Sequence, residues 1–575
     1  MSFAGPDGQC EWSHHEAGLA HALLCTDRSA REPAQPLTFD GTVRAVVDAR
    51  LDRRDELAGS LAAAGRHVRG DASDEELVLH AWHAWQTRCV EHLHGDFALI
   101  IWDAMHRRMF AARDRLGIRP LYWARLPGCV LVGNVQQSLA AHPDVASEIN
   151  RQSAADFLVE GCVRDPRATF LAGIRRLPPA HCLALSGDVR LSCYWTLQEP
   201  APLRYRRGED YVHQFQHVLK AAVADRLPRQ PVSVLMSGGL DSTSIAAMAR
   251  SVAGAGSRLE AHTVMHRRLV RDQEEHFALS AAGHLGIPVH FLCADEYRLC
   301  EAGGSACEPA CDALGQISND LLRRASQRTR VALSGDGGDV IFLYPLAGHM
   351  RRMRQERRHA AAVRDLLWYV RAFGGVPRPL MPRLSRWLGT RPAAIDLRQY
   401  LRAEPGGREV VRDAGWADSW PRADAAHALL DPFWPAVFEQ ENPGSTGVPV
   451  EVRYPLLDLR VVEFALAIPP VPWMVNKHIL RRAMRGLLPR DVRLHPKSPA
   501  GDLVRSRLLR GDMDDTSWAQ SQGIGTIMDT GRVGPPCPGQ HPDLCDMALR
   551  AVLLDRWLAD RERRAVLDHG ALRLA

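Results

Sequence analysis

Lysine is almost absent from this chain of 575 residues. Only three of its 72 basic residues are lysines, at positions 220, 477 and 497, and the other 69 are arginines. Because arginine carries nearly every positive charge, each remaining lysine marks a position where a compact ammonium group could be specifically required. The alternative is chance in an arginine-rich background.

The sequence also lacks long apolar runs and a strong excess of charge. The longest apolar run, residues 464–475, has only 12 residues and includes three prolines, so no segment predicts a membrane-spanning helix. The first ten residues lack the basic start and apolar core of a signal peptide, so we expect a cytoplasmic protein with free thiols. A net charge of +5 is too small to indicate nucleic acid or a membrane as a partner.

The predicted elements divide the chain into two parts. Up to about residue 205, short β runs alternate with turns, and a helix is predicted over 74–85 behind a Ser73-x-x-Glu76 capping box. This part is typical of a mostly antiparallel α+β domain. Its predicted strands are residues 43–47, 97–102, 108–112 and 129–132. The proline-containing stretch 197–208 is the predicted linker.

From about residue 210 the pattern changes to alternating helices and strands. This alternation favours a parallel α/β sheet, followed by about 150 mainly helical residues. The predicted strands are 232–236, 259–265 and 331–333, and the predicted helices are 211–227, 243–252 and 544–564. We therefore expect two domains, residues 1–205 and 206–575.

A glycine-containing loop, Ser237-Gly238-Gly239-Leu-Asp241-Ser242, lies between an apolar strand and the start of a helix. The glycines let backbone N–H groups face an anion, the serines add hydroxyl donors, and the helix adds the positive end of its dipole. These features predict a phosphate or pyrophosphate cradle. The Asp241 carboxylate would repel phosphate unless a cation such as Mg²⁺ lay between them. The chain has no Gly-Lys-Ser/Thr sequence, so this is not a Walker loop.

A second loop, Ser334-Gly335-Asp336-Gly-Gly-Asp339, follows another apolar strand. In a parallel sheet both loops would open at the carboxyl edge of the strands, where ligands bind. Asp241 and Asp339 could then share a Mg²⁺ ion held by the phosphates of ATP.

Four motifs in this order resemble the asparagine synthetase family. They are SGGLDS, SGDGGD, EVRYPLLDLRVVEFALAIPP and KHILRRAMRGLLPRDVRLHPKSP. The N-terminal half is similar to the glutamine-hydrolysing domain of that family. The similar segments there are SDEELVLHAW, LHGDFALIIWD, ARDRLGIRPLYW and TFLAGIRRLPPAH. The resemblance covers roughly residues 40–500. It implies an N-terminal glutaminase-like (Ntn-type) β-sandwich followed by an α/β ATP pyrophosphatase domain of the PP-loop type. The implied reaction uses ATP and Mg²⁺ and forms an acyl-adenylate, pyrophosphate and then an amide.

The resemblance also implies roles for single residues. Asp241 and Asp339 match the Mg²⁺ ligands of the family, and Lys477 matches the lysine that stabilises the transition state in its β-lactam synthetase branch. Asp336 and Glu451 are candidate proton acceptors, although Glu451 could equally be a structural ion-pair partner. Residues at matching nucleotide positions are Met236, Ser237, Gly238, Gly239, Ser242, Val264, Ser334 and Gly335, to which we add Lys497 as an undecided candidate.

Two positions depart from the glutamine-hydrolysing pattern. Residue 2 is Ser where the family has its nucleophilic cysteine, and Asp48-Ala49 stands where the family has an Asn-Gly oxyanion element. An acidic side chain there would oppose an oxyanion. We therefore expect an inactive first domain and an amine that comes with the substrate.

The substrate class follows from similarity to one branch of the family. The segment 450–489, with Pro-Pro-Val-Pro-Trp before Lys477, is most similar to lasso peptide macrolactam synthetases. This implies a ribosomal precursor peptide as substrate, with a leader peptidase and a leader-binding protein as partners. A β-lactam or carbapenam synthetase, another amide-forming synthetase, a glutamine-hydrolysing asparagine synthetase and a catalytically dead binding protein remain alternatives.

The segment 347–391 contains 11 arginines against Glu356 and Asp365, a local charge of 11 − 2 = +9. It could guide an acidic peptide or a partner protein. Solvated helix faces in an arginine-rich protein are an equally good explanation.

Overall fold

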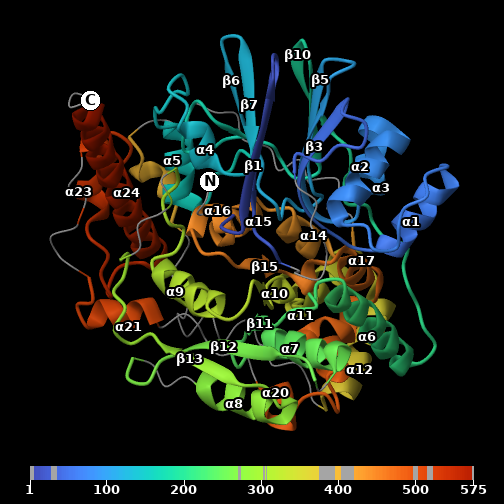
Figure 1. The fold of residues 1–575 in the computed structure, drawn as a ribbon. Coiled ribbons are helices and arrows are strands. Elements are labelled where there is room, and N and C mark those ends of the chain that lie inside the picture. The colour runs from blue at the N-terminus through green and yellow to red at the C-terminus, as the bar shows by residue number, and fades with distance from the viewer. Residues whose placement is uncertain are drawn as a thin grey trace.

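The chain forms two stacked domains in a computed structural model (Figure 1). The structure describes residues 5–572 except 27–34, 255, 270–272, 302–304, 306, 375–394, 403–419, 496–502, 514–517 and 519–521. In the view of Figure 1 the N-terminal domain forms the upper half, and the parallel sheet of the second domain lies in the lower half.

The N-terminal domain is a β-sandwich with helices on its outer face. One antiparallel sheet has the order β10-β9-β5-β4-β3, and a smaller sheet has the order β7-β6-β8. Side chains from both sheets, among them Ala111, Leu183 and Trp123, pack in one apolar cluster. The strands are β3 Val43–Leu51, β4 Gly95–Asp103, β5 Arg108–Arg113, β6 Tyr122–Leu126, β7 Cys129–Gly133, β8 Arg175–Arg176, β9 His181–Ser186 and β10 Asp188–Cys193. A separate hairpin is formed by β1 Gly8–His14 and β2 Ala17–Leu23.

Helices cover the other face of the larger sheet. Helix α2 (Asp74–Trp85) begins at the predicted capping box, in which Ser73 Oγ accepts the Glu76 N–H and the Glu76 carboxylate accepts the Ser73 N–H. Its buried Trp82 packs with Leu57 of α1 (Arg54–Ala63) in the core beneath the sheet. The other helices of this domain are α3 Cys89–His92, α4 Gln136–Ala140 and α5 Arg151–Glu160.

The second domain is built on a five-stranded parallel sheet of order β13-β12-β11-β14-β15. The strands are β11 Val232–Leu235, β12 Leu259–Met265, β13 Val289–Cys293, β14 Val331–Leu333 and β15 Glu451–Arg453. Helices connect or flank these strands. They are α6 Gly208–Ala224, α7 Leu240–Ala253, α8 Glu274–Leu285, α9 Gly315–Ser326, α10 Gly338–Phe342, α11 Leu346–Gln355 and α12 His359–Phe373. The predicted fold class, a sandwich followed by a parallel α/β domain with a helical C-terminal part, is confirmed.

The helical C-terminal part comprises α14 Ala423–Leu429, α15 Phe433–Glu441, α16 Pro443–Thr446, α17 Leu459–Ala467, α18 Pro470–Trp473, α19 His478–Ala483, α20 Arg490–Leu494, α21 Leu503–Leu509, α22 Gln522–Gly525, α23 Thr530–Val533 and α24 Pro542–Leu572. Helix α24 returns to the N-terminal domain and lies beside α5 (Figure 1). Phe157 and Leu158 of α5 share an apolar cluster with Trp557 of α24.

Buried ion pairs join the two domains. Arg226, just after α6, contacts Asp52 at 3.2 Å and Asp458 at 2.7 Å. At a second junction, Glu439 of α15 accepts hydrogen bonds from Arg113 and Arg176 of the first domain at 3.0 and 2.8 Å. All six side chains are almost inaccessible to solvent, so each charge depends on its buried partners.

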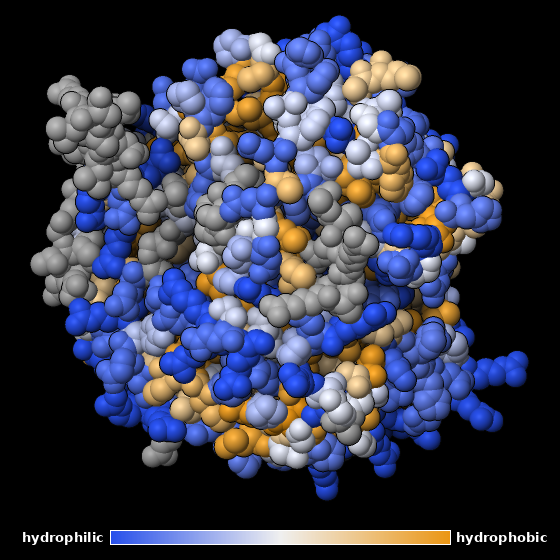
Figure 2. Space-filling model, viewed as in Figure 1, coloured by the Kyte–Doolittle hydropathy of each residue, from blue (hydrophilic) through white to orange (hydrophobic). Residues whose placement is uncertain are grey.

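The surface agrees with the modest charge and hydropathy of the sequence. In Figure 2 hydrophobic side chains form separate small groups among hydrophilic ones on the face shown. Among the described residues no helix is both long enough and apolar enough to cross a bilayer.

Candidate active site

The first glycine loop follows β11 at the carboxyl edge of the parallel sheet. The Met236 N–H donates to the carbonyl of His262 at 2.9 Å, which extends the β11–β12 pairing up to the loop. Gly239 then has an extended backbone and immediately precedes α7. The Ser237 and Ser242 hydroxyl oxygens lie 3.2 Å apart. The sequence motif therefore folds as a hydroxyl-lined turn at a helix N-terminus, the arrangement expected for a phosphate cradle.

Glycine is required where the loop meets its neighbours. A Cβ atom at Gly238 would lie 2.8 Å from the Glu274 carbonyl oxygen, and one at Gly335 would lie 2.6 Å from the Ser242 nitrogen. The second contact shows that the two glycine loops pack backbone against backbone. A Cβ at Gly338 would also overlap the Asp241 carboxylate. The residues that the sequence places 98 positions apart, Asp241 and Asp339, are thus held on adjoining loops.

Lys477 lies between these two carboxylates. Its Nζ contacts Asp241 Oδ2 and lies 2.6 Å from Asp339 Oδ1. The side chain is buried, and Asn476 and Lys477 both have positive φ angles, 51° and 56°, which turn the chain sharply just before α19. The predicted Mg²⁺ ligands and the predicted transition-state lysine therefore form one charged cluster at the mouth of the cradle.

The side chains at this edge of the sheet fit the predicted binding of Mg²⁺. Two carboxylate groups beside a phosphate-sized cradle are the oxygen ligands that Mg²⁺ takes when it also binds nucleotide phosphates. Val264, the remaining predicted nucleotide residue within the described chain, lies on β12 one position before the strand ends, at the same edge. Lys497 lies outside the described residues, so its role stays undecided.

Asp336 lies in the second loop, where its side chain is solvent-exposed but its hydrogen-bonded carboxylate is partly shielded. Its carboxylate accepts a hydrogen bond from Ser334 Oγ at 2.5 Å. This shielding raises the pKa of the carboxyl group, and the nearby Asp339 charge raises it further. A raised pKa suits a group that must accept a proton near neutral pH.

A second acidic residue accompanies Asp336, and the sequence motifs did not indicate it. Glu441, the last residue of α15, is half-buried, and its carboxylate accepts a hydrogen bond from the Tyr454 hydroxyl. Burial, reinforced by the Asp336 charge, raises the pKa of Glu441 to about 8. Its sequence signal was weak because an acidic residue in a helical stretch is usually solvent-exposed.

Glu451 requires a correction. Its carboxylate lies 2.7 Å from Arg119 Nη2 of the first domain and 2.7 Å from Arg453 Nε. These guanidinium groups lower the pKa of Glu451 to about 2 despite its burial. Such a carboxylate is a poor proton acceptor at neutral pH. Of the two roles considered from sequence, the structure supports the ion pair between domains and argues against the proton acceptor.

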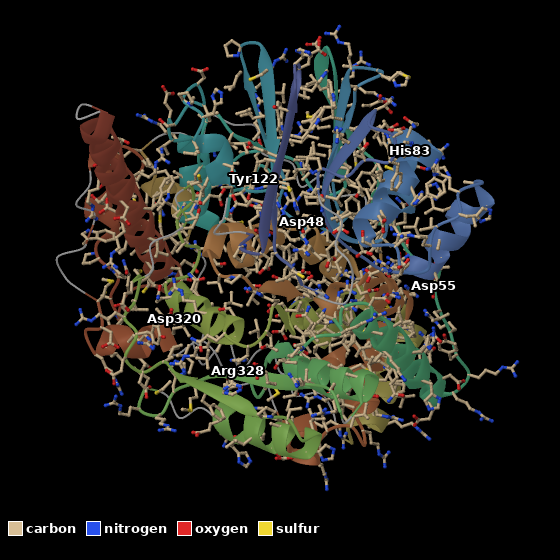
Figure 3. All side chains as sticks on the ribbon, viewed as in Figure 1. Asp48, Asp55, His83, Tyr122, Asp320 and Arg328 are labelled. Atoms are coloured by element: carbon tan, nitrogen blue, oxygen red, sulfur yellow. The ribbon has the colours of Figure 1, made fainter. Side chains whose placement is uncertain are left out.

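The first domain contains a cavity of about 410 Å³ where it meets the second domain. Asp48 of β3 lies on its wall, and its carboxylate accepts a hydrogen bond from Asn134 at 3.0 Å and pairs with Arg119 at 3.3 Å. Figure 3 shows Asp48 at the inner end of the N-terminal domain. Glu75 and Glu451 also line the cavity. Its walls therefore carry three acidic side chains together with Arg119 and Asn134.

Comparison with known proteins agrees with this geometry. Residues 1–195 match the family described as glutamine amidotransferase domain, and residues 214–521 match the family described as asparagine synthase. The chain is 26% identical over 534 residues to asparagine synthetase [glutamine-hydrolyzing] 3 of Bacillus subtilis, covering 87% of this chain and 82% of that protein. It is 29% identical over 369 residues to amidase chyE of Penicillium rubens, covering 59% of this chain and 52% of that protein.

Among solved structures, the chain is similar to a glutamine phosphoribosylpyrophosphate amidotransferase from B. subtilis. The alignment has a TM-score of 0.22 and 14% identity and covers 48% of this chain and 51% of that one. The asparagine synthase match, by contrast, spans more than half of the chain and contains both glycine loops and Lys477. The protein is therefore an ATP-dependent, amide-forming ligase that belongs to the asparagine synthase family.

Proposed function

We propose that this protein is a macrolactam synthetase of the lasso peptide type. It activates the side-chain carboxylate of an Asp or Glu in a ribosomal precursor peptide as an acyl-adenylate. It then joins that acyl group to the N-terminal amine of the same peptide and releases AMP. The proposal rests on the family assignment for the amide-forming chemistry and on the sequence similarity of segment 450–489 for the peptide substrate.

The observation that carries the proposal is the environment of Asp48. Its carboxylate pairs with Arg119 and accepts a hydrogen bond from Asn134, so an acidic group occupies the cavity wall where the family resemblance implies an oxyanion element. This supports a first domain that produces no ammonia. The attacking amine must then belong to the substrate, as it does in ring closure within one peptide.

Activation takes place at the two glycine loops. The substrate carboxylate attacks the α-phosphorus of ATP, and pyrophosphate leaves within the cradle of Ser237, Gly239 and Ser242. Asp241 and Asp339 would hold Mg²⁺, which would neutralise phosphate charge. Lys477 lies between these two carboxylates, so its ammonium group would be close to oxygen atoms that become negative in the transition state.

Amide formation requires removal of a proton from the attacking amine. The pKa values of Asp336 and Glu441 are both raised, and the Asp336 charge contributes to the shift of Glu441. We assign the proton acceptor to this pair of carboxyl groups, and the Tyr454 hydroxyl fixes the Glu441 carboxylate in place.

A precursor peptide also needs a docking surface and, in such pathways, partner proteins. Helices α11 and α12 carry the described part of the arginine-rich segment, and six of its seven arginines are exposed; residues 375–391 lie outside the described chain. We propose that this face guides an acidic peptide segment or the leader peptidase and leader-binding protein of the pathway.

The test is an assay with purified protein, ATP, Mg²⁺ and a precursor core peptide. The expected products are AMP, pyrophosphate and a peptide lighter by one water. Asp241→Asn should abolish adenylation while the circular dichroism spectrum is unchanged. Formation of glutamate from added glutamine would instead support a glutamine-hydrolysing synthetase. AMP release with a small-molecule substrate but with no peptide would favour the β-lactam type of synthetase.

A further inference from the structure

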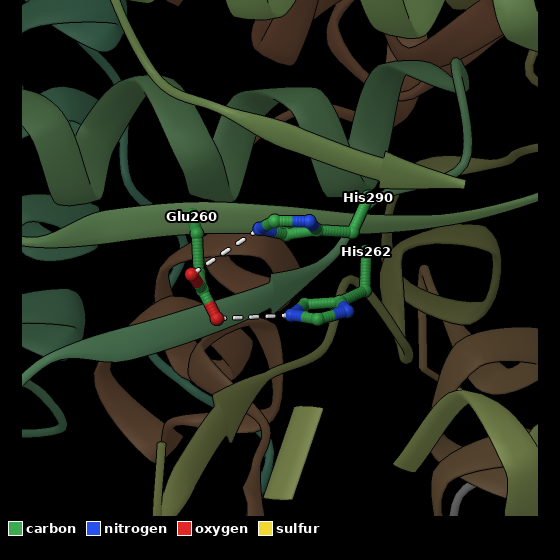
Figure 4. A group of neighbouring side chains, drawn as sticks. All are labelled: Glu260, His262 and His290. Atoms are coloured by element: carbon green, nitrogen blue, oxygen red, sulfur yellow. Dashed lines mark hydrogen bonds and ion pairs between the residues drawn. The ribbon is translucent and has the colours of Figure 1, made fainter. Parts of the chain in front are cut away.

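Three metal-ligating side chains gather on the parallel sheet away from the glycine loops. Glu260 and His262 are two residues apart on β12, so both side chains lie on the same face of the sheet. His290 on β13 is the in-register partner of His262 in the parallel ladder. The local sequence Glu-x-His and the strand register together place the three side chains side by side, as Figure 4 shows.

Their ligand atoms have the spacing of a metal site. His262 Nε2 lies 3.1 Å from one Glu260 carboxylate oxygen, and His290 Nε2 lies 3.4 Å from the other. One ligand atom from each residue lies within 4.8 Å of the others. Two ligand atoms that are each 2.0–2.1 Å from a tetrahedral zinc ion are about 3.3 Å apart, so the observed spacing needs little rearrangement to admit the ion.

The environment also suits a cation. His262 is buried, so its imidazole is shielded from bulk water on the sheet. The His290 side chain is 31% exposed, although its Nε2 atom is buried. Its Nε2 atom makes no hydrogen bond to any described residue. The nearest arginine, Arg328 (labelled in Figure 3), lies 3.9 Å from Glu260 Oε2 and extends into solvent.

We propose that Glu260, His262 and His290 form a Zn²⁺ site with three protein ligands and a fourth position for water. The site lies toward the amino ends of β12 and β13, whereas the ATP loops follow the carboxyl ends of β11 and β14. Because β13 is the edge strand of the sheet, the ion would fix this strand to β12 and stabilise that side of the domain. The site is separate from the Mg²⁺ ligands Asp241 and Asp339.

The direct test is titration of chelator-treated, full-length protein with Co²⁺, followed by displacement with Zn²⁺. We expect one equivalent of Co²⁺ with visible d–d bands of tetrahedral intensity and no near-ultraviolet sulfur-to-cobalt band, because no ligand is a cysteine. Zn²⁺ should remove the bands. A sulfur band, or no tight equivalent at all, would overturn the proposal and leave a metal-free hydrogen-bonded cluster.

Two variants locate the ion. His290→Ala removes a half-exposed ligand, so the variant should fold, and the affinity should fall by at least about 100-fold, since loss of a supporting second-shell partner alone costs 10–100-fold. His276→Ala, which removes a 70% exposed histidine of α8, is the matched control and should bind normally. Zn²⁺ should raise the thermal unfolding midpoint of the wild type and of the control, but not of His290→Ala. An equal rise in all three proteins would place the metal elsewhere and refute the assignment.

Discussion

The ammonium group of Lys477 lies 2.6 Å from Asp339 Oδ1, although 138 residues separate the two positions in the sequence. The same ammonium group contacts Asp241. A single buried lysine thus connects the two glycine loops of the synthetase domain. Because these three charged side chains are so close together, substitution of any one of them should change the activity strongly.

Replacement of Lys477 by Arg should lower kcat by about 10²–10³-fold, the range for losing one preorganised donor to a developing oxyanion. The planar guanidinium cannot take the place of a compact ammonium between two carboxylates. Steady-state release of pyrophosphate measures the effect. Lys220→Arg, on the exposed face of α6, is the matched control and should leave turnover unchanged. Normal turnover of the Lys477 variant would contradict the assigned role.

Replacement of Gly335 by Ala should separate the two glycine loops. Its Cβ would lie 2.6 Å from the Ser242 nitrogen, a contact that forces backbone to move. We expect weaker ATP binding and at least a tenfold loss of kcat/KM, in line with the sensitivity of catalysis to ångström-scale displacement. Gly283→Ala in α8 is the control, because a Cβ there meets no atom within 4 Å. Equal ATP affinity in both variants would show that the loops tolerate separation.

Replacement of Glu439 by Ala should destabilise the junction between the domains. It leaves Arg113 buried without a carboxylate partner and Arg176 with only Glu308, which costs about 3–5 kcal/mol. Urea unfolding and limited proteolysis should show earlier loss of the domain contact. Glu91→Ala breaks an exposed pair with Arg88 and should cost no more than about 1 kcal/mol. Similar urea midpoints for the two variants would indicate that the junction does not depend on this ion pair.

Glu441 predicts a pH dependence of stability. Its pKa in the folded protein is about 8, above the ordinary value of 4.5, so the folded state binds the proton more tightly than the unfolded state does. This residue's contribution to stability is therefore complete below pH 4.5 and is lost as the pH rises through 8. Glu441→Gln should unfold at a more nearly constant temperature between pH 6 and pH 9. Thermal unfolding across this range checks the sign, and a variant with the same pH dependence as wild type would exclude Glu441 as its source.

Much of the fold could be predicted from local patterns. The capping box at Ser73 and Glu76 and the strands that precede both glycine loops appear where hydrophobic periodicity placed them. Boundaries moved by a few residues, as for α6, which begins at Gly208 and ends at Ala224 instead of spanning 211–227. Short-range hydrogen bonding and alternation of apolar residues determine such elements, so the sequence alone contains the signal.

The partners of charged side chains could not be predicted in the same way. Glu451 was an open choice between a base and an ion-pair partner until its neighbours Arg119 and Arg453 were known. Glu441 gave no signal because its raised pKa arises from burial and from Asp336, 105 residues earlier. Desolvation and Coulomb interaction depend on distances through space, which the order of residues does not state.

The sequence by itself determined the two glycine loops, their order, the acidic residue Asp48 at the position of the expected oxyanion element and the scarcity of lysine. Only the tertiary structure decided what the lysines do. Lys220 is exposed on α6, whereas Lys477 is buried between Asp241 and Asp339. A buried ammonium group is stable only beside opposite charge, and here that charge comes from two loops that the parallel sheet brings to one edge.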